Sequence, residues 1–136
     1  MFNKAMRQFT TPEQTAELIE LGFEKPKSIK SAIPMGFHAI WCDRAYSIGE
    51  LIEILPTYCW YKYGDKAYRA QLKIFFALSR WRIAYRKFED DHVGHLYGTQ
   101  GDELIDALYD MCIKLKEENY KLNNQNDKRL CSQKRK

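Results

Sequence analysis

Seven basic side chains lie close together in the middle of the sequence. Between residues 66 and 88 the chain carries no acidic residue, and the basic ones are Lys66, Arg69, Lys73, Arg80, Arg82, Arg86 and Lys87. Lysine and arginine neutralise phosphates, and aromatic side chains beside them can stack on bases. The segment is therefore a candidate surface for nucleic acid or another polyanion. The alternative is that these charges only solvate an edge hairpin and discourage strand-to-strand aggregation.

The rest of the chain is mostly acidic. The formal net charge is +4, from 22 basic and 18 acidic side chains. Residues 127–136 hold five basic and one acidic side chain, and the 103 positions outside this end and the segment 66–88 hold 10 basic and 17 acidic ones. A second alternative is therefore that the positive segment faces acidic helices of the same chain.

One short cluster has side chains that bind metals. Asp91, His92 and His95 place two imidazoles three residues apart beside a carboxylate. A zinc site needs a third and a fourth ligand, and the sequence does not supply them at a recognisable spacing. We therefore expect a solvated loop here, with no metal and no cofactor.

Catalytic motifs are absent from the sequence. It has no nucleophile elbow, P-loop, zinc-protease helix or dinucleotide-binding fingerprint. The four cysteines, at positions 42, 59, 112 and 131, form no C-x-x-C pair. Because no secretory signal is recognisable, we expect reduced thiols in a cytoplasmic protein. The sequence therefore favours a non-enzymatic protein.

Aromatic residues make up 14% of the chain and gather in its central half. A domain of this size is not expected to bury all of them, and exposed Trp and Tyr favour protein–protein contacts. Our main expectation is therefore a protein partner or self-association through exposed aromatic residues, with Trp60 and Trp81 as candidates. Nucleic-acid binding is the alternative, through Arg69, Lys73, Arg80, Arg82 and Arg86.

Three helices are expected to hold these surfaces, at residues 12–21, 47–55 and 102–119. The first two begin with a capping box, in which Thr11 or Ser47 is followed three residues later by Gln or Glu. The third has a long apolar stripe, with acidic residues at its start and lysines towards its end, which complements the helix dipole.

The segment 66–88 is expected to form a hairpin that turns near residues 78–80. Apolar and polar residues alternate along it, so that Leu72, Ile74, Trp81 and Ile83 would point inward. One long helix is the rival, because the segment contains neither Gly nor Pro. β-branched and aromatic residues favour strands. Further strands are expected at residues 38–42 and 58–61, an extended connector at 23–34, and a Gly-rich loop at 89–101.

These elements predict one α+β domain at residues 11–122. A small antiparallel sheet of about three to four strands would pack against the three helices. Residues 1–10 are expected to be a flexible N-terminus, and residues 123–136 a disordered basic tail. No apolar run is long enough to span a membrane, so no membrane association is expected.

Three phrases of the sequence resemble those of other chains. They run from Leu18 to Pro26, from Tyr46 to Pro56 and from Asp102 to Tyr109. Through them, roughly residues 11–120 resemble a group of small uncharacterised proteins found on prophages and other mobile elements of gut anaerobic bacteria. The resemblance implies an intracellular accessory protein of phage type, and it supplies no catalytic residues.

Overall fold

The computed structural model describes residues 6–34, 36, 40–89 and 92–120. This part of the chain forms three helices, α1 (Pro12–Glu20), α2 (Ile48–Ile54) and α3 (Leu104–Glu117). Strands β3 (Tyr58–Tyr63), β4 (Lys66–Ala77), β5 (Arg80–Glu89) and β6 (His92–Gly101) form an antiparallel sheet in that order. Strands β1 (Ile29–Pro34) and β2 (Ile40–Arg44) pair only with each other. The expected α+β fold is confirmed.

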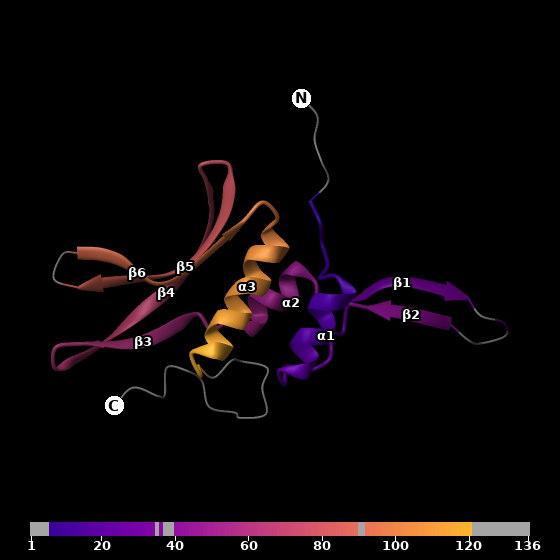
Figure 1. The fold of residues 1–136 in the computed structure, drawn as a ribbon, viewed down its shortest axis with the longest axis horizontal. Helices are drawn as coiled ribbons and strands as arrows, with labels where there is room; N and C mark the ends of the chain where they lie inside the picture. Colours follow the sequence, from indigo (N-terminus) through magenta and orange to yellow (C-terminus); the bar gives the residue numbers. More distant parts are fainter. Residues whose placement is uncertain (1–5, 35, 37–39, 90–91, 121–136) are drawn as a thin grey trace.

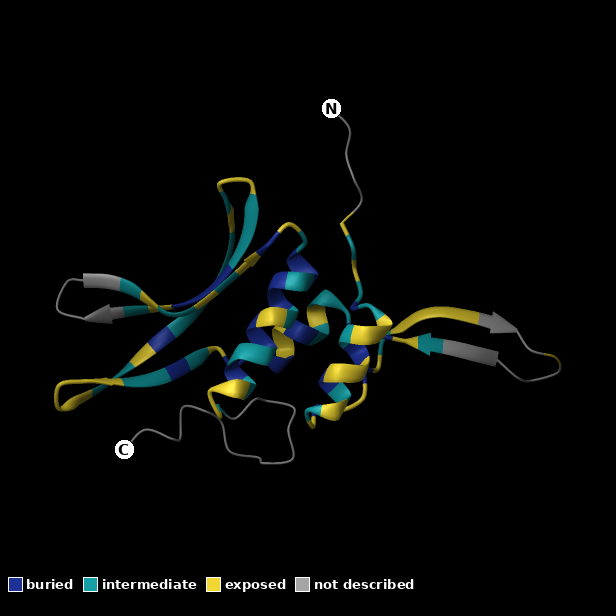
Figure 2. Cartoon of the chain, in the orientation of Figure 1, coloured by how far each residue is buried: buried dark blue, intermediate teal, exposed yellow. Residues whose placement is uncertain are grey.

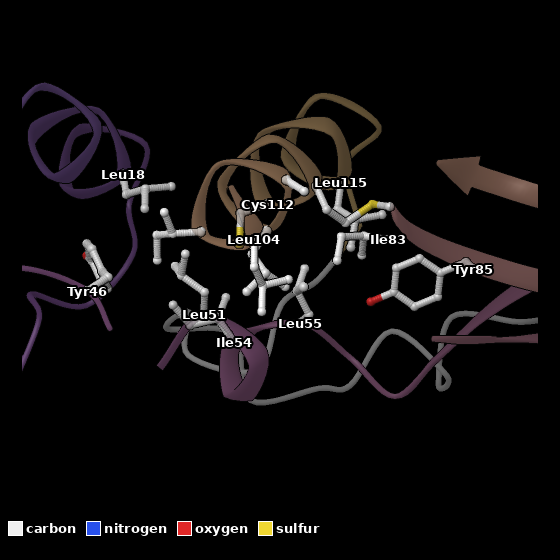
Figure 3. Packing of buried hydrophobic residues seen from close by; sticks show 14 of the residues in the cluster. Leu18, Tyr46, Leu51, Ile54, Leu55, Ile83, Tyr85, Leu104, Cys112 and Leu115 are labelled. Carbon is white, nitrogen blue, oxygen red and sulfur yellow. The ribbon is translucent and has the colours of Figure 1, made fainter. Parts of the chain in front are cut away.

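Helix α3 lies at the centre of the molecule. The curled four-stranded sheet is on one side of it, α1 and α2 are on the other, and the β1–β2 hairpin points away from the sheet (Figure 1). The buried residues of α3 pack between α2 and the inner side of the sheet (Figure 3), and they are Leu104, Ile105, Ala107, Leu108, Met111, Cys112 and Leu115. The apolar stripe that the sequence predicts for this helix therefore packs inside the domain.

Both capping boxes form as predicted. The Thr11 hydroxyl accepts from the Gln14 backbone N–H at 3.1 Å, and the Gln14 side chain accepts from the Thr11 N–H at 2.9 Å. Ser47 and Glu50 make the same reciprocal pair at the start of α2. These bonds satisfy backbone donors that a helix start leaves without partners, so they fix where both helices begin.

The predicted hairpin in the segment 66–88 is confirmed, and the rival helix is wrong. Strand β4 pairs with β5 in the register that places Ile74 opposite Ile83. The turn residues Leu78 and Ser79 have φ angles of 54° and 64°. Two successive left-handed residues are typical of a type I′ hairpin turn, which normally selects Asn and Gly. The turn therefore forms without its usual sequence signal.

The loop predicted at residues 89–101 is wrong, because β6 occupies most of that segment. Its glycines lie inside a strand. The register pairs Tyr85 with Tyr97 and Arg86 with His95, so Leu96 is an extra residue in β6. A Cβ atom at Gly101 would lie 3.5 Å from the backbone N of Ala107, which shows how closely the start of α3 approaches the strand end. Glycine marks a bulge or such a close approach as often as a turn.

The strand predicted at residues 38–42 is confirmed at residues 40–42, where β2 runs from Ile40 to Arg44, and residues 38 and 39 lie outside the described residues. This strand does not join the main sheet. Its partner β1 arises within the predicted connector. Near the N-terminus, Arg7 donates through its backbone N–H to Glu103 and through its guanidinium group to Asp106. Residues 7–10, which belong to the predicted N-terminal segment, therefore contact the domain. The predicted tail at residues 123–136 lies outside the described residues.

Candidate nucleic-acid interface

The register of the sheet gathers the predicted basic residues on one side. Directly opposite residues of an antiparallel pair point to the same face, and successive residues alternate between faces. Phe75 lies opposite Arg82, Lys73 opposite Ala84, and Gln71 opposite Arg86. We call this side the outer face. The five predicted residues Arg69, Lys73, Arg80, Arg82 and Arg86 lie on it, and so does Lys62 of β3. The opposite, inner face carries the buried Ile83 and Tyr85, which pack in the core with α3.

Aromatic side chains lie among these charges. Trp60 is opposite Arg69 and Tyr58 is opposite Gln71, so both share the outer face with Phe75. The Arg69 guanidinium carbon lies 4.3 Å from the centre of the Tyr58 ring, which is a cation–π contact.

Trp81 belongs to the other side of the sheet, so the two candidate tryptophans do not form one surface. It lies opposite Phe76 on β4, and the centres of the two rings are 5.3 Å apart. Trp81 also packs partly against the core. The sequence pattern groups Trp60 with Trp81 as binding residues. In the sheet, Trp60 on β3 and Trp81 on β5 point to opposite faces.

The basic side chains of the outer face differ in what holds them. The Arg82 Nε donates to the Ala77 carbonyl at 3.0 Å, and its Nη1 donates to Gln100 Oε1 at 2.6 Å. Arg80 lies 3.3 Å from Asp102, which partly neutralises its charge. Arg86 is exposed, and Lys73 is half-buried. No acidic side chain lies on the outer face within the described residues of the four strands.

A hollow of about 250 Å³ opens on the outer face between β4, β5 and β6. Ala84 and Gly98, which lie opposite each other, form its floor. Larger side chains surround this pair, and those lining the hollow are Phe75, Arg82, His95 and Gln100. The hollow exists because two of the smallest residues sit in one row of the sheet between rows of long side chains. We call it the Ala84–Gly98 hollow.

The sequence does not reveal this hollow, because half of it comes from the segment predicted to be a loop. Only the alternation along residues 66–88 could find part of it, since that pattern places Phe75 in the basic row. His95, Gly98 and Gln100 reach the outer face through the pairing of β6 with β5. Nothing in the local sequence of β6 predicts that pairing.

The metal candidates are only partly described. His95 is exposed on the outer face, where it lies opposite Arg86. Asp91 and the side chain of His92 lie outside the described residues. Among the residues that the structure does describe, no three His, Cys, Asp or Glu side chains come together in a group suited to hold a metal ion.

The reactive groups of the interior have structural roles. The side chains of Cys59 and Cys112 are fully buried, and burial raises the pKa of Cys112 to about 12. A second hollow of about 330 Å³ lies between residues 24–28 and α2. Burial tends to raise the pKa of Glu50 there, but hydrogen bonds from Lys27, Ser28 and Ser47 outweigh it and lower the pKa overall. This carboxylate therefore serves the helix cap.

Comparisons with known proteins give no match: no family model, no curated protein and no solved structure resembles the chain significantly. None of the helices in the described residues combines the length and apolar character needed to cross a membrane. The function must therefore be inferred from the chemistry of the surface itself.

Proposed function

We propose that the protein binds nucleic acid through the outer face of the four-stranded sheet. The observation that carries this proposal is the strand register, which brings six basic side chains to one face together with the aromatic rings of Tyr58, Trp60 and Phe75. Within the described part of the strands, that face has no acidic side chain, and Asp102, which follows β6, pairs with Arg80. The charge of the outer face is thus complementary to a phosphate backbone.

Phosphate contacts supply the affinity in this proposal. Each cation that neutralises a phosphate releases condensed counterions, which gives binding that does not depend on base sequence. Arg69, Lys73, Arg82 and Arg86 are the four cations best placed for this, since Arg80 is shared with Asp102 and Lys62 lies at the far end of the sheet beside the β3–β4 turn. With about four such contacts, log K should fall with log salt with a slope of about −3 for a single strand.

Aromatic rings distinguish this surface from a purely solvating charge layer. Phe75, Tyr58 and Trp60 offer apolar faces at which unpaired bases can stack. Strands β4 and β5 are the two central strands of the sheet, so their basic side chains do not protect an open edge.

Within this proposal the protein is a non-enzymatic accessory factor that acts in the cytoplasm. The phage-type origin suggested by the three sequence phrases stays an expectation, because the comparisons match no known protein. The absence of catalytic motifs from the sequence agrees with a non-enzymatic role.

Binding to a fluorescent single-stranded oligonucleotide of 20 residues tests the proposal directly. Fluorescence anisotropy at low salt should give a dissociation constant of about 10⁻⁶–10⁻⁴ M or tighter, the range of non-specific nucleic-acid binding. A chain that leaves the anisotropy unchanged at low salt would contradict the proposal, provided that its circular dichroism shows a folded protein.

A protein partner is the second candidate function, and the tip of the β4–β5 hairpin favours it. Leu78 is 85% exposed and Phe76 is 58% exposed. Figure 2 shows the turn between β4 and β5 as exposed. A large apolar side chain in a left-handed turn conformation is unusual, and such local exceptions tend to occur at functional sites. Capture of a host protein by the nuclease-treated wild-type chain, and its loss with Leu78→Asn, would support this candidate.

A further inference from the structure

We infer that the Ala84–Gly98 hollow seats one unpaired base of a single-stranded nucleic acid. This inference rests on the proposed function and specifies its ligand. It assigns a task to each side chain around the hollow, and it predicts that single strands bind more tightly than duplexes of the same charge.

Gly98 is not required by the backbone at its position. It is absent from the residues with positive φ, and a Cβ atom built there would approach the Ile83 carbonyl oxygen no closer than 3.9 Å. An alanine would therefore fit. Glycine weakens a strand interior relative to alanine, and it often marks a place where a ligand or another backbone comes close. The missing side chain at this position is what leaves the floor of the hollow open.

The volume of the hollow limits what it can hold. At about 250 Å³ it is smaller than the roughly 300–1,000 Å³ of typical small-molecule pockets. It has room for a single flat ring system, and a complete dinucleotide cofactor would extend beyond it. A ligand that places one ring there must therefore make most of its contacts outside the hollow. One nucleotide of a longer strand meets this condition, because its neighbours contact the rest of the surface.

The surrounding side chains match the parts of a nucleotide. Phe75 offers an apolar ring beside the floor, and Gln100 and His95 offer hydrogen-bonding groups that can reach the edge of a base. Arg82 is fixed by its bonds to Ala77 and Gln100, so its guanidinium group is positioned before a ligand arrives. A preorganised group loses less conformational entropy on binding.

Two further cations border the hollow on the outer face, one across the sheet on β4 and one along β5. Lys73 is directly opposite Ala84 on β4, and Arg86 is two residues further along β5. Phosphates on either side of a seated base would meet these two side chains. The strand β6 is at the edge of the sheet, so an extended chain can continue past it without meeting another described strand.

A single strand fits this arrangement better than a duplex. In a duplex the bases are paired and stacked, and an enzyme or binding protein must flip one out to reach it. A single strand presents its bases already unpaired, and proteins read such strands by stacking bases on aromatic side chains. The phosphates of a duplex could still contact the basic side chains, but its bases could not enter the hollow.

Gly98→Val tests the inference, with Gly94→Val as its matched control. Valine at position 98 fills the floor, whereas Gly94 lies in the same strand on the inner face, where its nearest neighbour is the flexible Lys87 side chain at 3.4 Å. Affinity for a single-stranded 20-residue oligonucleotide is measured by anisotropy, beside an abasic oligonucleotide of equal length and a duplex. Melting temperatures show that both variants are folded.

We expect Gly98→Val to weaken binding of the base-bearing single strand at least tenfold, while Gly94→Val binds as the wild type does. The wild type should prefer the base-bearing strand over the abasic one, and Gly98→Val should lose that preference. Equal affinity of wild type and Gly98→Val, or equal binding of abasic, duplex and base-bearing ligands, overturns the inference and leaves the proposed function standing. A wild type that binds none of the three ligands overturns both.

Discussion

Phe75 on β4 lies directly opposite Arg82 on β5, so a ring and a guanidinium group share one row of the outer face. Along the sequence alone, Phe75 interrupts a row of charges. In the folded sheet it lines the same hollow as Arg82, beside the small residues Ala84 and Gly98. The pair combines the two contacts that a nucleotide needs, an apolar surface for the base and a positive charge for the phosphate.

Replacing Phe75 by leucine should weaken binding to single-stranded oligonucleotides roughly tenfold, because base–aromatic stacking contributes about 1–3 kcal/mol per base. The dependence of affinity on salt should stay the same, since no charge is removed. Phe76→Leu is the control, because Phe76 is the next residue and points to the inner face. Equal losses in the two variants, measured by fluorescence anisotropy, would show that stacking at Phe75 has no special role.

The turn at Leu78 and Ser79 should tolerate, and benefit from, the usual type I′ residues. Both positions have positive φ, where Asn and Gly are less strained than Leu and Ser. Replacing Leu78 by Asn together with Ser79 by Gly is expected to raise the free energy of unfolding by about 1–2 kcal/mol. Urea denaturation followed by circular dichroism measures this. A lower unfolding midpoint would mean that the tip residues stabilise the free domain.

The ion pair between Arg7 and Asp106 should make the fold sensitive to acid. Burial tends to raise the pKa of Asp106, but hydrogen bonds from Arg7 and Gln14 and the Arg7 charge outweigh it and hold the pKa below its ordinary value of 3.8. A carboxyl group with a lowered pKa stabilises the fold fully above its unfolded-state pKa, and that stabilisation is lost as the pH falls through the folded-state pKa.

Arg7→Gln should therefore lose less stability than the wild type between pH 6 and pH 3. The effect should be modest, because both side chains are more than one-third exposed and solvent screens their attraction. Urea midpoints at the two pH values measure it, with Lys30→Gln as a control for the removal of one positive charge. If the urea midpoints of wild type and Arg7→Gln fall equally between the two pH values, the ion pair does not contribute to the acid sensitivity of the fold.

The buried thiols should resist alkylation. Burial raises the pKa of Cys112 to about 12, so almost none of it is thiolate near pH 8, and Cys59 is also fully buried. Iodoacetamide at pH 8 should label both residues only after denaturation, as peptide mass spectrometry can show. Rapid labelling of Cys112 in the folded chain would reveal an opening of the core beside α3.

The sequence predicts the helices and the central hairpin because their signals are local. Capping boxes at Thr11 and Ser47 fix two helix starts, and the stripe of α3 fixes the third helix. Alternation along residues 66–88 predicts which side chains share a face, so the basic row could be found before the structure.

Strand β6 could not be predicted in the same way, because its glycines and its bulge imitate a loop. Its position depends on pairing with β5 and on the close approach of α3 at Gly101, and both are tertiary contacts. The Ala84–Gly98 hollow depends on that pairing as well. Local sequence patterns therefore could not predict the part of the candidate site that lies on β6.

The central claim is that cations of the outer face bind the phosphates of nucleic acid. Its most direct test compares Arg82→Glu/Arg86→Glu with Lys27→Glu/Lys30→Glu. The second pair changes the net charge equally at exposed positions just before and within β1, and the β1–β2 hairpin points away from the four-stranded sheet (Figure 1). Affinity for a single-stranded oligonucleotide is measured by anisotropy between 50 and 200 mM salt. About four phosphate contacts predict a roughly 50-fold loss of wild-type affinity over this range.

The outer-face variant should lose roughly two orders of magnitude in affinity at low salt, while the control variant should keep nearly all of it and the same salt dependence. Two variants that are weakened equally would show that only the overall charge of the protein matters. An outer-face variant that binds as tightly as the wild type would contradict the claim outright.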